Sequence, residues 1–65
     1  MEDLRNRAIS KINDYISYMM RVEGSYQMKV ELYYACCGKI HLAFDLGLIS
    51  KDEKKELLRD SARAI

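Results

Sequence analysis

The sequence predicts an all-α protein in which two long helices form an antiparallel hairpin and a shorter third helix packs against it. Three observations predict this class. The 65 residues contain no proline, apolar residues recur at helical spacing, and a serine–glutamate capping signal precedes the last segment. We expect a single domain, residues 1–65.

The first helix is predicted over residues 3–22. Apolar residues recur there every three or four positions and fall on one broad face, with polar residues opposite. Asp3 is placed to cap the start of this helix. Glu23 then ends the pattern, Gly24 is expected to adopt the left-handed conformation, and Ser25 is expected to cap the next helix. This short turn makes the first two helices antiparallel neighbours.

The second and third helices are predicted over residues 26–46 and 51–63. Gly47 suits the position just after a helix end, because glycine adopts a positive φ at little cost. Ser50 and Glu53 have the spacing of a capping box, in which each side chain accepts a backbone N–H of the other residue. This is the most specific local signal in the sequence.

The charge and composition exclude several classes of protein. Eleven basic and ten acidic residues alternate along the chain and give a net charge of +1, so no polyanion partner is indicated. No apolar run approaches the ~20 residues that a membrane span needs, and the first residues lack the apolar segment of a signal peptide. We therefore expect a cytoplasmic protein with reduced cysteines and no membrane partner.

The second helix is apolar around most of its circumference, and a helix of that kind needs neighbours on most sides. The helices before and after it are expected to cover only part of this surface, so we predict a homodimer in which two hairpins form a helical bundle. One apolar sector and a glycine that allows close approach form the predicted interface: Tyr26, Val30, Tyr33, Cys37, Gly38, Ile40 and Phe44. The other apolar sector holds Met28, Leu32, Ala35, Cys36, Leu42, Ala43 and Leu46.

Cys37, His41 and Asp45 follow one another at intervals of four and would line one flank of the second helix. One interpretation is a thiol enzyme with a thiolate, a base and an orienting carboxylate. Another is a metal site, in which two copies would supply the four ligands that structural zinc takes. The favoured interpretation is structural: the cysteines fill space as small hydrophobic residues, and His41 pairs with Asp45 at the surface. We predict no catalytic, metal-binding or cofactor-binding residue.

The predicted function is binding of another protein by a noncatalytic helical protein such as an inhibitor, adaptor or regulator. Aromatic residues and methionines, which are abundant here, are enriched at the centres of protein interfaces. The small size suggests an origin in a phage or mobile element. Exposed aromatic rings and the cations near them form the candidate partner-binding set: Arg7, Lys11, Tyr18, Arg21 and Tyr34.

A nucleic-acid-binding regulator is the alternative function. The second and third helices would then form a helix-turn-helix, with the third helix in the DNA groove. Asp52 and Glu53 in the first turn of that helix oppose contact with phosphates, and acidic residues alternate with the lysines and arginines that follow.

Overall fold

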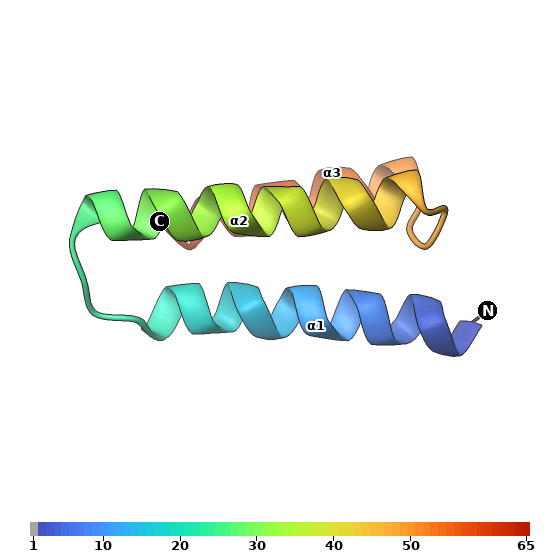
Figure 1. Cartoon of the computed structure of the whole chain (residues 1–65), viewed down its shortest axis with the longest axis horizontal. Coiled ribbons are helices and arrows are strands. Elements are labelled where there is room, and N and C mark those ends of the chain that lie inside the picture. The colour runs from blue at the N-terminus through green and yellow to red at the C-terminus, as the bar shows by residue number, and fades with distance from the viewer. Residues whose placement is uncertain (1) are drawn as a thin grey trace.

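The computed structural model describes residues 2–65, which fold into three helices and no strand. Helix α1 spans Glu2–Arg21, α2 spans Tyr26–Asp45 and α3 spans Lys51–Arg63. α1 and α2 form an antiparallel hairpin, and α3 returns alongside α2 (Figure 1). The body measures 37 × 17 × 15 Å. The all-helical prediction is confirmed, with helix boundaries within one residue of those predicted, whereas the assembly of two copies stays a prediction.

The starts of α2 and α3 are fixed by the two serines that the sequence identifies. The Ser25 hydroxyl accepts a hydrogen bond from the Met28 amide at 3.2 Å. The Ser50 hydroxyl accepts one from the Glu53 amide at 3.1 Å, and the Glu53 carboxylate accepts one from the Ser50 amide at 2.8 Å. Because each bond satisfies a backbone donor that the helix itself leaves free, both helices begin where they were predicted to begin.

The end of α2 is a Schellman turn centred on Gly47, which has a φ of +75°. The Leu48 amide donates to the Ala43 carbonyl at 2.9 Å, and the Gly47 amide donates to the Phe44 carbonyl at 2.9 Å. These two bonds satisfy carbonyls that would otherwise lack partners at the helix end. The chain therefore turns sharply after α2 and sends α3 back along it.

Two local predictions are wrong. Gly24 has no positive φ; within residues 2–65, Gly47 is the residue with that conformation. The connection between Val22 and Ser25 is long enough to reverse the chain without a left-handed residue. Asp3 does not cap α1, because the helix already begins at Glu2 and Asp3 lies within its first turn. Its carboxylate still lies near the positive end of the helix dipole.

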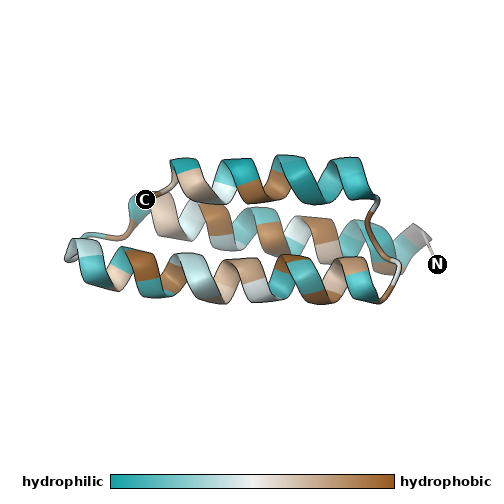
Figure 2. Cartoon of the chain, turned by 90° about the horizontal axis from the view of Figure 1, so that it is seen from above, coloured by the Kyte–Doolittle hydropathy of each residue, from teal (hydrophilic) through white to brown (hydrophobic). Residues whose placement is uncertain are grey.

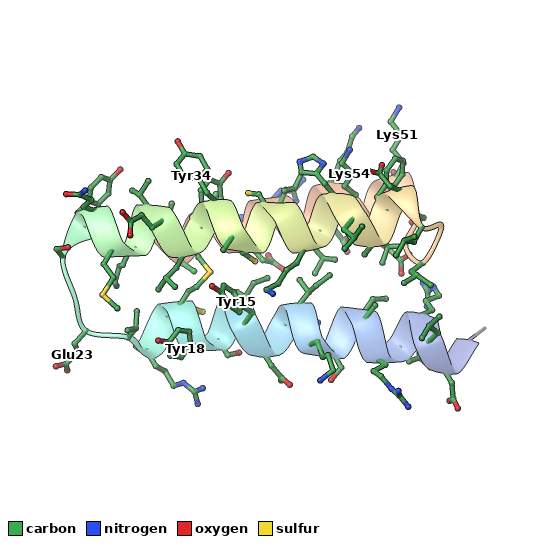
Figure 3. The ribbon with its side chains drawn as sticks, in the orientation of Figure 1. Tyr15, Tyr18, Glu23, Tyr34, Lys51 and Lys54 are labelled. Carbon is green, nitrogen blue, oxygen red and sulfur yellow. The ribbon has the colours of Figure 1, made fainter. Side chains whose placement is uncertain are left out.

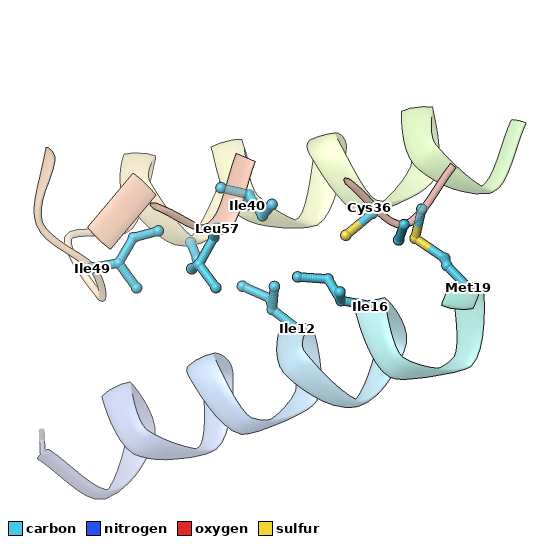
Figure 4. Close-up of a cluster of buried hydrophobic side chains, with 9 residues drawn as sticks. Ile12, Ile16, Met19, Cys36, Ile40, Ile49 and Leu57 are labelled. Carbon is cyan, nitrogen blue, oxygen red and sulfur yellow. The ribbon is translucent and has the colours of Figure 1, made fainter. Parts of the chain in front are cut away.

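The core is a narrow layer of side chains from all three helices and from the connection before α3. Its members are Ile12, Ile16, Met19, Cys36, Ile40, Ala43, Ile49, Leu57 and Ala64 (Figure 4). Ser61 is also fully buried, and its hydroxyl donates to the Leu57 carbonyl at 2.8 Å. The Cys36 sulfur lies 3.2 Å from the same hydroxyl, so neither polar group is left without a partner.

The helices cover α2 unevenly. Ile40 is completely buried, whereas Leu42 and Leu46 remain 59% and 64% exposed. Figure 2 shows the contrast between the mostly hydrophilic α3 and the hydrophobic bands along α2. The chain thus leaves part of the apolar circumference of α2 in water, as the sequence predicts.

The α2 sector predicted as a dimer interface is the one that α3 partly covers. The Lys54 ammonium of α3 lies 4.4 Å from the centre of the Phe44 ring. Ile40 belongs to the core and keeps no surface for a second chain, so it cannot be an interface residue in this fold. The half-buried members of the set are Val30, Tyr33, Cys37 and Phe44, and its exposed members are Tyr26 and Gly38.

Candidate protein-binding face

Cys37, His41 and Asp45 differ in how far the fold covers them. Cys37 is half-buried, whereas His41 and Asp45 are exposed. Within residues 2–65, no group of three or more histidine, cysteine or acidic side chains is placed to hold a metal ion.

The two cysteines lie in different surroundings. Burial raises the pKa of the Cys36 thiol, although its hydrogen bond with Ser61 acts in the opposite direction, so Cys36 stays protonated at neutral pH. The interaction with the neighbouring Cys37 side chain raises the pKa of the Tyr33 phenol. The raised pKa of Cys36 fits a cysteine that fills space between helices, because a reactive cysteine needs a lowered pKa.

An open apolar groove runs between α1 and α2 on the side of the hairpin away from α3. Its walls are Ala8, Lys11, Ile12, Lys39, Leu42, Ala43, Leu46 and Leu48. A second hollow continues along the same side and is lined by Lys11, Asp14, Tyr15, Tyr18 and Lys39. Figure 3 views this side, with Tyr15 between the two helices and Tyr18 beside it on α1.

The residues on this side repeat at intervals of three and four along both helices. In α1 and the residue after it they are Leu4, Ala8, Lys11, Tyr15, Tyr18 and Val22, and in α2 and the residue after it they are Met28, Leu32, Ala35, Lys39, Leu42 and Leu46. We call these twelve residues the hairpin face. On each helix these positions are the core positions displaced by one residue. The hairpin face is therefore rotated by about 100° around the helix axis from the face that packs in the core. Each long helix therefore carries two seams, one used by the core and one left open.

Several large apolar side chains of the hairpin face are exposed. Leu4 is 50% exposed, and Leu42 and Leu46 are exposed to a greater extent. Tyr18 is 45% exposed. Leu42 and Leu46 line one groove, which distinguishes them from the scattered surface leucines that most proteins carry.

Two lysines interrupt the apolar seam near its middle. The Lys39 ammonium lies 5.3 Å from the centre of the Tyr15 ring, within the range of a cation–π contact. Lys11 lines both hollows with Lys39, and Asp14 is the acidic group beside them. The groove thus has apolar ends and a positively charged middle.

The outer edges of the hairpin face carry charges at intervals of seven residues. The α1 edge holds Arg7, Asp14 and Arg21, and the α2 edge holds Glu31, Gly38 and Asp45. All six residues are exposed. The α1 edge is therefore positive at both ends, and the α2 edge is negative at both ends.

The structure gathers four of the five predicted partner-binding residues at this face. Lys11 and Tyr18 lie within it, and Arg7 and Arg21 lie on its α1 edge. Tyr34 is separate: it is 68% exposed and points away from α1 (Figure 3).

Sequence reasoning missed Leu4, Leu42 and Leu46 as functional candidates. The signal that would have found them is the second three-and-four repeat, which runs in parallel with the core repeat on both long helices.

The exposed surface of α3 does not form a cationic patch. Its exposed residues alternate in charge and include Lys51, Asp52, Lys55, Glu56, Arg59 and Asp60. Glu53 is held by the Ser50 amide and by an ion pair with Arg5 of α1. These two contacts lower the pKa of the Glu53 carboxyl, the backbone contact most. The nucleic-acid alternative gains no support from such a mixed surface.

Comparison with protein-family models, with curated proteins and with solved structures finds no match to this chain. Among the described residues, no helix is both long enough and apolar enough to cross a membrane.

Proposed function

We propose that the protein is a noncatalytic protein-binding module and that its hairpin face binds helices of another chain. The observation that carries the proposal is the apolar groove between α1 and α2, with Leu42 and Leu46 more than half exposed at its rim. Contiguous exposed apolar surface rimmed by polar residues marks interaction sites in soluble proteins. An inhibitor, an adaptor and a regulator each act through such a face.

The spacing of the hairpin face supports a helical partner. Seams with intervals of three and four accept the side chains of another helix lying nearly parallel, as in coiled coils and four-helix bundles. The tyrosines within the seam and the charges along its edges give the aromatic centre and polar rim that protein interfaces have.

The proposal is tested by photo-cross-linking from the face. A p-benzoylphenylalanine replaces Leu42 in one variant and Met20 in a matched control, because Met20 is 65% exposed but lines the groove between α1 and α3. We expect discrete higher-mass protein adducts from position 42, several-fold more abundant than from position 20. Equal yields from both positions, in variants with unchanged helicity, would contradict the proposal.

A further inference from the structure

We propose that the occupant of the hairpin face is a second copy of this chain, related by a two-fold axis parallel to the helices. In this arrangement α1 of each copy lies against α2 of its partner, and the α3 helices lie outside. The inference rests on the proposed function, because it names the occupant of the same face.

Two symmetric arrangements keep the helices aligned when identical hairpins meet face to face. With the two-fold axis parallel to the helices, α1 meets the partner's α2 and each residue keeps its level along the bundle. With the axis across the helices, α1 meets the partner's α1, α2 meets α2, and the levels are reversed. The charges on the edges of the face distinguish the two.

The levels follow from contacts within one hairpin. Lys39 lies beside Tyr15, and Ala8 shares the groove with Leu46. Because α1 and α2 are antiparallel, these contacts place Arg7 close to the level of Asp45 and Arg21 close to the level of Glu31, within two residues or ~3 Å along the axis. Asp14 is likewise close to the level of Gly38.

The parallel-axis arrangement brings opposite charges together along both outer edges. Arg7 lies across from Asp45 of the partner, Arg21 lies across from the partner's Glu31, and Asp14 lies across from the partner's Gly38. The crosswise axis would instead place Arg7 across from Arg21, Asp14 across from its own copy, and Glu31 across from Asp45. Edge charges of this kind set the orientation of packed helices, so they select the parallel axis.

Gly38 gives an independent indication. A glycine within a helix costs about 1 kcal/mol relative to alanine, yet a methyl group at position 38 would meet no atom of this chain within 4 Å. Packing within the chain therefore does not require a glycine there. In the proposed dimer, Gly38 of one copy lies across from Asp14 of the other copy. Near this level the ammonium group of Lys11 must pass the partner helix to reach water. The missing side chain leaves that path open.

A standard dimer interface needs only a modest part of the surface of this chain. A standard protein interface buries about 800 Å² on each partner, which is about a sixth of the 4669 Å² accessible surface of this chain. The hairpin face is one of the three long sides of the three-helix body, and a dimer would need about this sixth of the surface from it.

The lysines in the middle of the face oppose association. Lys11 and Lys39 of both copies would lie within about one helical turn of one another, with Asp14 of each copy beside them. A charged residue within a helical seam fixes the register at a cost in affinity. The dimer is therefore weak enough for a foreign helix to displace, so self-association and partner binding compete for one face.

Four variants examined by sedimentation velocity test the arrangement. The first reverses the α1 edge (R7E with R21E), the second reverses the α2 edge (E31K with D45K), and the third combines all four changes. A control pair on α3, R59E with R63E, changes the net charge as much as the first variant does.

We expect the wild type and the fourfold variant to dimerise similarly, because the fourfold variant restores every opposite-charge pair. Each single-edge variant should weaken the dimer at least about tenfold, since four rim pairs become repulsive, and a mixture of the two should recover it. The control pair should leave the dimer unchanged. Equal self-association of the wild type, both single-edge variants and the fourfold variant would overturn the arrangement.

The cross-linking experiment separates this inference from the proposed function. A dimer-mass adduct from position 42 of the purified protein supports the second copy. Adducts with other polypeptides in a cell extract, without a dimer-mass adduct from the purified protein, would refute this inference and leave the proposed function standing, whereas no adduct in either sample would refute both.

Discussion

Replacing Gly38 with alanine should stabilise the isolated chain by about 1 kcal/mol, because alanine has the higher helix propensity. The structure sets this magnitude: Gly38 lies within α2, has an ordinary helical φ, and a methyl group there would meet no atom within 4 Å. No steric cost therefore subtracts from the propensity gain. For a domain of this size, 1 kcal/mol raises the melting temperature by about 4–8 °C.

Thermal melting followed by circular dichroism measures this effect, at a dilution where sedimentation shows a monomer. The matched control is Ala35→Gly, also exposed on α2, which should lower the melting temperature by a similar amount. At concentrations where the protein dimerises, the gain at position 38 should shrink because the methyl group then faces the partner's Asp14. An unchanged or lowered melting temperature for Gly38→Ala in the dilute sample would show that the chain itself requires a glycine at this position.

Three further predictions concern the core, the link between α1 and α3, and the middle of the hairpin face. Ile40→Ala should cost about 2–5 kcal/mol, enough to unfold much of a small domain at 25 °C by circular dichroism, since Ile40 is completely buried. The pKa of Glu53 is lowered below about 4.5 by the folded contacts with Ser50 and Arg5. The stabilisation that these contacts give the fold is therefore fully present above that pH and is lost as the pH falls through the lowered pKa. The melting temperature of Glu53→Gln should consequently change less with pH below 4.5 than that of the wild type. Lys39→Met should lower the dimer Kd several-fold in sedimentation velocity, because it removes a charge that the interface would bury; a raised Kd would contradict the proposed dimer.

The local signals were the predictable part of the fold because each depends on residues a few positions apart. Ser25, Gly47 and the pair Ser50 and Glu53 fixed the helix ends by hydrogen bonds and a positive φ that any surroundings would allow. The predicted left-handed conformation of Gly24 was wrong because it depends on the length of the connection as well as on local composition. A glycine-containing connection does not need a left-handed residue when it is long enough to reverse the chain.

The candidate site was harder to predict because it depends on which flank of α2 the third helix covers. Both flanks are apolar, so a helical projection offers α3 two nearly equal places to pack. The structure puts α3 over the flank of Phe44 and leaves the flank of Leu42 and Leu46 open. The sequence alone therefore identified an excess of apolar surface on α2 but not which of its two apolar sectors α3 covers.

The most direct test of the open face is methyl NMR of the wild-type chain across a dilution series. We expect concentration-dependent chemical shifts at the methyl groups of Leu4, Leu42 and Leu46, with the exposed Met20 methyl on the other flank of α1 unchanged. Shifts confined to Met20, or invariant leucine methyls in samples that sediment as dimers, would contradict this expectation.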